Sequence, residues 1–379
     1  MWPKIFRNGI VLLRVIPYAG SGTVLDTLSS SAKDRTTMEH ARVSQEARPS
    51  SVAQFCVKRT SDVHVHASHL SAWEQQYEQV SRGVFSGVVR EVAAPGLQVF
   101  EEWASCATAQ HCRPWSGGVW IGMPVPEDTQ GLRYMGRSVD SQQWMWANDD
   151  QVFDLFVPAG VGLYGVVLDG RDMMRHLHWR DGRGECGTGQ SFASTGWSGM
   201  QLQHLTIAQR QRLTGLLREV LINVERTPEV LSHDASRQAL HHAVLTVVCD
   251  LAVPREVQPV MVGRHHRRLT LVRRARELIL ERPQDFSHLT ALCAALHVTR
   301  RTLQNCFHEV MGISPAAYLR EVRLNAVRRA LQSPLEAQHT ITEIAARWGF
   351  WHMGHFGREY KTLFGETPSQ TRAAWLEVK

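Results

Sequence analysis

Four polar side chains lie close together near the start of a predicted helix in the last third of the 379-residue chain. They are Arg300, Arg301, Gln304 and Asn305. Arginine can form paired hydrogen bonds with guanine, and glutamine or asparagine can do the same with adenine. These residue types at helical spacing therefore predict base reading in the major groove of DNA, with an ordinary solvated helix face as the alternative.

A second group of outward side chains follows further along the chain and has different chemistry. Its members are Trp351, His352, Met353, His355 and Arg358. Gly354 and Gly357 lie in the same predicted helix, and each glycine costs about 1 kcal/mol relative to alanine. That cost predicts a close approach to another backbone or to DNA. We expect this helix to contribute shape and backbone contact, and the first helix to read sequence more strictly.

Two copies of one helical pattern must position these side chains. Leu289 matches Ile341, 52 residues later, and Phe307 matches Tyr360, 53 residues later. The change of offset predicts a turn one residue longer in the second copy. A repeat of this length predicts two helix-turn-helix units.

Capping residues mark where the helices of the repeat begin. Thr299 is placed to cap the first reading helix, and Thr340 with Glu343 matches a capping box. Ser314 followed by Pro315 predicts a connecting helix between the units. Its arginines make it strongly basic: Arg320, Arg323, Arg328 and Arg329. A rigid connection would hold two reading helices about one turn of DNA, roughly 10 bp, apart.

The positive charge of the chain is concentrated in this repeat. Residues 264–379 hold 18 Lys/Arg and 10 Asp/Glu, so their net charge is 18 − 10 = +8, whereas the whole chain carries +6. The remainder is therefore close to −2. A basic domain beside a near-neutral one indicates that only the basic part binds a polyanion.

We expect residues 51–252 to form an effector-sensing and dimerisation domain that is built mainly from strands. Five short runs of β-branched and aromatic residues alternate with turn residues, which is typical of a small antiparallel barrel or sandwich. The runs are 84–92, 97–103, 118–125, 151–158 and 161–168. His69 to Val80 is the exception, because Leu70, Trp73 and Tyr77 share one helical face with Val80.

Other segments complete the predicted organisation. Two amphipathic helices between residues 201 and 252 should pack on the sheet or pair two protomers as a homodimer. Residues 253–263 read as a linker, 180–199 as an exposed loop and 1–50 as a disordered tail. The predicted fold class is α+β with two domains: a β-barrel or sandwich with helices, then an all-α double helix-turn-helix domain at 264–379.

The sequence offers little sign of catalysis or of a metal site. His64 and His66 would share one face of a strand and His69 lies nearby, but no further ligand is evident, so solvated or core histidines are the simpler interpretation. Seven cysteines without a CxxC pair favour reduced thiols in the cytoplasm. No apolar run is long enough to cross a membrane.

The repeat resembles the AraC/XylS family of bacterial transcription regulators. The resemblance covers 264–379 and rests on I-x-E-I-A…GF…F-x-R-x-[YF]-K from Ile341 to Lys361 and on G-x-[ST]-P at 312–315 and 365–368. It implies a monomer that inserts two recognition helices into successive major grooves of double-stranded DNA and activates transcription by contacting RNA polymerase. Trp351 and Gly354 depart from the polar residues usual in the family.

A narrower resemblance within that family concerns the signal. WGFWHMGHF at 348–356 and parts of residues 60–170 are similar to activators of ethanolamine-utilisation operons. This implies a cupin-like β-barrel sensor that responds to a small-molecule effector, ethanolamine together with adenosylcobalamin.

Two other functions use similar DNA-binding modules. An alkyl-DNA repair enzyme needs an activated Pro-Cys-His nucleophile or a four-cysteine zinc site, but Cys112 lies in His-Cys-Arg-Pro, the wrong order. An architectural DNA-binding protein would leave Gln304, Asn305 and the large N-terminal domain unexplained.

Overall fold

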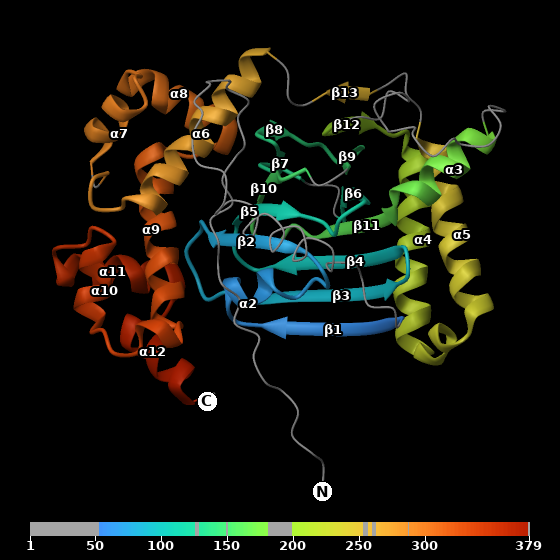
Figure 1. Cartoon of the computed structure of the whole chain (residues 1–379), viewed down its shortest axis with the longest axis horizontal. Coiled ribbons are helices and arrows are strands. Elements are labelled where there is room, and N and C mark those ends of the chain that lie inside the picture. The colour runs from blue at the N-terminus through green and yellow to red at the C-terminus, as the bar shows by residue number, and fades with distance from the viewer. Residues whose placement is uncertain are drawn as a thin grey trace, which may run out of the picture. The chain divides into compact units, whose positions relative to one another are not determined.

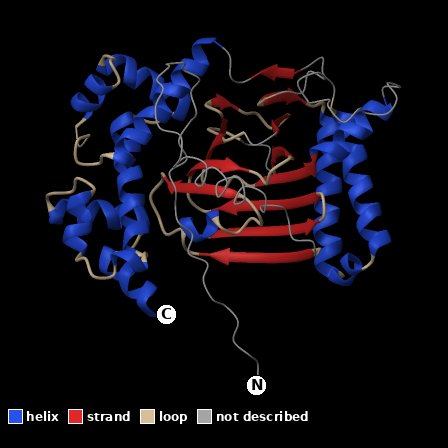
Figure 2. Ribbon diagram, in the orientation of Figure 1, coloured by secondary structure: helices blue, strands red, loops and turns tan. Residues whose placement is uncertain are grey.

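The computed structural model describes residues 53–125, 129–148, 151–180, 199–252, 257–259, 263–286 and 288–377. Strands dominate the first part of the chain and helices the last (Figure 2). The predicted α+β class with two domains is confirmed. The tail 1–50 and most of the predicted loop at 180–199 lie outside the described residues.

Two antiparallel sheets form the N-terminal part, which we call the β domain (β1 to β13; Figure 1). The eight-stranded sheet has the order β1-β3-β4-β11-β6-β9-β12-β13 and the five-stranded sheet the order β2-β5-β10-β7-β8. The strands of the larger sheet are β1 Gln54–Thr60, β3 Gly87–Ala94, β4 Leu97–Ala104, β6 Gly118–Pro124, β9 Gln143–Asn148, β11 Leu163–Asp169, β12 Gln201–His204 and β13 Val257–Pro259. Those of the smaller sheet are β2 Glu74–Gln79, β5 Thr108–Arg113, β7 Arg133–Tyr134, β8 Arg137–Ser138 and β10 Phe153–Val157.

An aromatic core lies between the two sheets. Trp120 of β6 stacks on Phe153 of β10 with ring centroids 4.2 Å apart, and Trp73 meets both rings edge-on. The five predicted strands are confirmed as β3, β4, β6, β10 and β11. Several further strands, among them β1, β5 and β9, were not predicted.

Three helices cover the other face of the larger sheet: α3 Gly170–Arg180, α4 Ile207–Arg226 and α5 Asp234–Leu251. Leu213 and Leu217 of α4 and Val248 of α5 share a buried cluster with sheet residues such as Trp144. The two amphipathic helices therefore pack on the sheet, as predicted. Ile207, the first residue of α4, is 61% exposed and takes no part in this packing.

The helix predicted from His69 to Val80 is wrong. A short helix, α2 (Val63–Ala67), precedes this segment, and residues 74–79 form the edge strand β2. Glu78 and Gln79 of β2 are buried although polar, because both bond to the C-terminal helices, which the local pattern cannot reveal. The segment 253–263 is also more than a linker, since β13 pairs with β12.

The C-terminal domain contains seven α-helices within the described residues. They are α6 Gly263–Glu281, α7 Leu289–Ala295, α8 Arg300–Met311, α9 Pro315–Leu331, α10 Ile341–Arg347, α11 Met353–Phe364 and α12 Pro368–Glu377. The connection 348–352 between α10 and α11 is one residue longer than 296–299 between α7 and α8, so the repeat and its offset are confirmed. No described helix is long and apolar enough to cross a membrane.

Candidate nucleic-acid interface

The first reading helix, α8, is held by a cap and a buried apolar face. The Thr299 hydroxyl accepts the Thr302 backbone N–H at 3.1 Å, as predicted. Leu303 and Phe307 are fully buried. All four predicted base-reading side chains are exposed, and within the described residues they enter no hydrogen bond or ion pair: Arg300, Arg301, Gln304 and Asn305. They are thus available to a ligand outside the chain.

The second reading helix, α11, presents a different surface. Trp351 is 63% exposed just before it, and His352 and His355 lie with ring centroids 6.4 Å apart. Arg358 is exposed, and its Nε donates to the Gly354 carbonyl at 3.2 Å. Met353 is instead half-buried against the core of the second unit, so it is the least accessible of the five predicted residues.

The two glycines of α11 lie in open space. A Cβ added at Gly354 or Gly357 would meet no atom within 4 Å. The predicted close approach to another backbone is therefore wrong within the described chain. Approach of DNA to this bare stretch of helix stays a prediction.

The turns before the reading helices need one left-handed residue each. Gly349 supplies it in the second unit with φ of 80°, whereas His297 adopts φ of 53° in the first. Glycine takes this conformation without a steric penalty and histidine does not. The two turns thus share a left-handed conformation, but only the turn with His297 carries a steric penalty for it.

The connecting helix α9 joins the cores of both units. Tyr318, Leu319 and Val322 lie in the cluster that includes α8, and Leu324 and Val327 lie in the cluster that includes α11. The cap of α9 by Ser314 is confirmed by a 3.3 Å hydrogen bond from the Ala317 N–H. The apolar residues of α9 therefore pack against both units.

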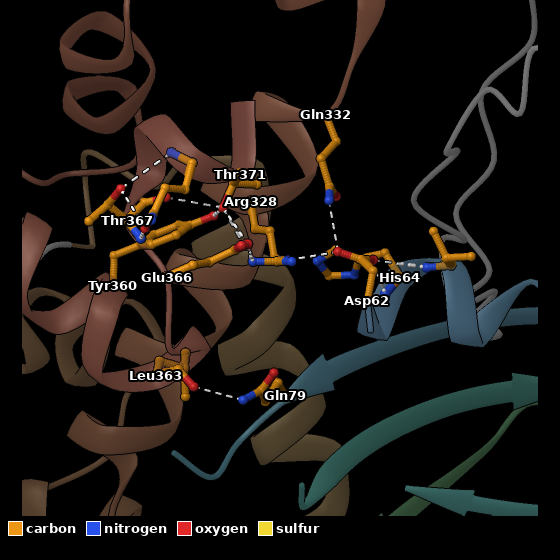
Figure 3. A network of polar contacts seen from close by, with 12 residues as sticks. Asp62, His64, Gln79, Arg328, Gln332, Tyr360, Leu363, Glu366, Thr367 and Thr371 are labelled. Carbon is orange, nitrogen blue, oxygen red and sulfur yellow. Dashed lines mark hydrogen bonds and ion pairs between the residues drawn. The ribbon is translucent and has the colours of Figure 1, made fainter. Parts of the chain in front are cut away.

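The arginines of α9 do not form a uniform basic face. Arg320 is exposed and lies 3.5 Å from Glu359, but Arg328 is buried. Arg328 Nε binds Asp62 of the β domain at 2.8 Å, and its Nη1 binds Glu366 at 2.6 Å (Figure 3). Burial disfavours the charged guanidinium, yet Asp62 raises the pKa of Arg328 above its usual value, so the pair stays ionised.

Further polar contacts join the β domain to the C-terminal helices. Arg276 lies 2.5 Å from buried Glu78, and Arg273 lies 2.5 Å from Asp154. The Asn325 amide accepts from the Gln79 N–H at 3.0 Å and donates to the Gln79 carbonyl at 2.9 Å. This interface was not predicted from the sequence. Its only local signal is a set of charged and amide residues inside otherwise apolar patterns.

Within the described residues, the histidine cluster and Cys112 show no catalytic arrangement. His64 and His66 belong to helix α2, not to a strand as predicted, and His66 Nε2 lies 2.9 Å from Glu102. In the described part of the chain, no group of three or more His, Cys, Asp or Glu could hold a metal ion. Burial raises the pKa of the Cys112 thiol well above its usual value, the opposite of an activated nucleophile.

Comparison with known proteins places this domain. A helix-turn-helix domain model matches residues 292–374. The XylDLEGF operon transcriptional activator of Pseudomonas putida is 37% identical over 83 residues, which are 22% of this chain and 26% of that protein. The transcriptional regulator GlxA of Rhizobium meliloti is 29% identical over 232 residues, which are 57% of this chain and 62% of that protein.

A solved structure is similar to part of the chain. A probable AraC family transcriptional regulator from Rhodopseudomonas palustris is 30% identical and covers 27% of this chain and 97% of its own, with a TM-score of 0.25. The chain spans about a quarter of the length of the P. putida relative, 26%. Residues 292–374 therefore match a helix-turn-helix domain, and the chain is similar over part of its length to bacterial transcriptional activators and regulators.

Proposed function

We propose that this protein is a sequence-specific, DNA-binding transcription activator whose β domain responds to a small molecule. The observation that carries the proposal is the pair of reading helices, each seated on a buried core and each exposing side chains at its N-terminal end. This is the end that enters the major groove in helix-turn-helix proteins. Relatives named as transcriptional activators and regulators support it.

The basic residues support binding to double-stranded DNA. Phosphate contacts would position the protein, and Arg301 with Gln304 would read bases. His352, His355 and Arg358 of the second unit would contact the backbone, with Trp351 against the groove wall. Activation would then follow from a contact with RNA polymerase.

DNA binding is tested by selection of duplexes from a random pool with the full chain, followed by affinity measurement on the selected and a scrambled duplex at 150 mM salt. We expect the selected duplex to bind at least ~10³-fold more tightly, in the range of specific regulators. Equal affinity for both duplexes would favour an architectural protein.

The finer proposal is that ethanolamine with adenosylcobalamin is the signal and an ethanolamine-utilisation operon the target. It rests on the sequence resemblance alone. Each compound, and then both, should be added to the full chain while the thermal midpoint and the affinity for the selected duplex are measured. If neither quantity changes with either compound or with the mixture, this effector is wrong while DNA binding stands. Sedimentation of the same samples would show whether a homodimer forms.

A further inference from the structure

The two helix-turn-helix units are attached to the β domain in different ways. Apolar residues of the first unit, including Phe307 and Val310, belong to the same buried cluster as the core between the two sheets. Residues of the second unit, including Phe356 and Tyr360, form a cluster of their own. The second unit is therefore the part that polar contacts must hold in place.

Those polar contacts converge on the C-terminal end of α11 (Figure 3). The last carbonyls of a helix have no partner within the helix. At α11 the Leu363 carbonyl accepts from Gln79 Nε2 at 2.7 Å and from the Gly83 N–H at 3.0 Å, both of the β domain. The equivalent end of α8 is held similarly, because Arg133 Nη1 donates to the Glu309 carbonyl at 3.0 Å. The β domain thus touches the ends of both reading helices.

Arg328 carries the charged part of this attachment. Its guanidinium lies over the Phe364 ring at 4.8 Å and binds Glu366, so it contacts the end of α11 and the segment that follows. Glu366 accepts from the Thr371 hydroxyl at 2.7 Å, and Thr371 lies 2.9 Å from the Tyr360 hydroxyl. A displacement of Arg328 would therefore be felt in both α11 and α12.

Asp62 is the β-domain partner of Arg328 and has two separate tasks. Its Oδ1 caps helix α2 by accepting the backbone N–H groups of His64 and Val65 at 2.8 and 3.0 Å. Its Oδ2 accepts from Arg328 and from Gln332 at 2.8 and 2.7 Å. One carboxylate thus joins α2 of the β domain to the connecting helix α9.

We propose that Asp62 is a positioning residue for DNA reading: by binding Arg328 it fixes the second reading helix at a defined separation from the first. Asp62 touches no DNA in this role. The proposal rests on the proposed DNA-binding function for its meaning, but its structural half can be measured without DNA. Through this contact the β domain would determine which spacing between DNA half-sites the protein can bind.

The sharpest variant is Asp62→Asn. Asparagine caps a helix as well as aspartate does, so α2 keeps its cap while the ion pair with Arg328 is lost. The matched control is Asp285→Asn, which makes the same charge change at an exposed acid of the C-terminal domain that lies 3.8 Å from Arg282.

The first measurement is hydrogen–deuterium exchange of the full chain. Asp62→Asn should raise exchange in α11 and α12 at least tenfold, with α8 and the strands unchanged. Asp285→Asn should leave all of them unchanged. Unaltered exchange in α11 and α12 of Asp62→Asn would overturn the proposal, and this result does not depend on DNA.

The second measurement uses the selected duplex with one base pair inserted between its half-sites. The wild-type chain should lose at least tenfold in affinity and Asp62→Asn less than threefold, because its second unit can adjust. Equal losses would overturn the proposal. If the wild-type chain selects no duplex, the proposed function fails while the exchange result still decides the structural claim. Should Asp62→Asn not fold, Gln79→Met, which removes a donor to the Leu363 carbonyl, takes its place in both measurements.

Discussion

The two helix-turn-helix units differ in which of their two helices has a side-chain N-cap. In the first unit the reading helix α8 is capped by Thr299, whereas His288, at the N-cap position of the supporting helix α7, makes no capping hydrogen bond. In the second unit the supporting helix α10 has a full capping box, whereas His352, at the N-cap position of the reading helix α11, makes no capping hydrogen bond. In the first unit the cap therefore stabilises the reading helix α8, whereas in the second unit it stabilises the supporting helix α10.

The same contrast extends to side chains and attachment. The first unit offers arginine and amide groups suited to bases, and its core continues into the β domain. The second offers an indole, imidazoles and two glycines, and polar contacts hold it. We infer a stiff reader joined to an adjustable one. Four predictions test this contrast.

The largest effect should come from the anchor of the second unit. Arg328→Ala leaves Asp62 and Glu366 without their main partner, and removal of one member of a buried pair costs about 3–5 kcal/mol. The free energy of unfolding in urea should fall by that amount. The control Arg320→Ala removes an exposed ion pair, in which Arg320 lies 3.5 Å from Glu359. It should lower the free energy of unfolding by about 0–1 kcal/mol. Equal losses for both would mean that the second unit is not anchored through Arg328.

The next effect separates base reading from backbone contact. Arg301→Ala should cost about 1–3 kcal/mol of binding free energy on the selected duplex and little on a scrambled one. Trp351→Ala should weaken both duplexes to a similar extent, because the second unit reads shape. Titrations with both duplexes measure this, and Arg267→Ala on α6 is the charge-matched control. A loss for Arg301→Ala that is equal on both duplexes would reassign this residue to phosphate.

A smaller effect concerns the glycines of α11. Gly354→Ala and Gly357→Ala should each raise the free energy of unfolding by about 1 kcal/mol, because alanine favours the helix and the new Cβ meets nothing. If DNA approaches this stretch, the same changes should weaken affinity for the selected duplex. Stability and affinity that rise together would show that the glycines serve no approach.

The smallest effect tests the caps directly. Thr299→Ala should cost about 1 kcal/mol of unfolding free energy because α8 loses its cap, whereas His352→Thr should stabilise α11 by about 0.5–1 kcal/mol. Thr342→Ala, at an exposed position within α10, is the control. The contrast between the two reading helices would be removed if Thr299→Ala lost no stability or if His352→Thr gained none.

The sequence predicted best where cause and effect are close together along the chain. Thr299, Ser314 and Thr340 act within one helical turn, so their caps and the helices they begin could be foreseen. The repeat foretold the longer turn before α11 for the same reason. Strands β3, β4 and β11 were recognised because each is rich in valine or aromatic residues.

The sequence predicted poorly where the partner is distant. Glu78 meets Arg276 across 198 residues and Gln79 meets Asn325 across 246, so the apolar spacing around them suggested a helix instead of strand β2. Arg328 looked like one more basic surface residue because Asp62 lies 266 positions earlier. The position of the DNA-reading side chains on an exposed helix face could be predicted from the sequence. The bases that they would contact could not, because those depend on the geometry of the complex with DNA.

The paired hydrogen bonds between Asn325 and the main chain of Gln79 bear on how such regulators can be recombined. A side-chain amide here takes the place of a neighbouring strand at the edge of a sheet. Chimeras that graft this β domain onto another reading domain would leave that edge, Glu78 and Asp62 facing side chains that do not match them. The two halves are therefore not interchangeable modules, and a working exchange would have to carry α6 and α9 along with the β domain.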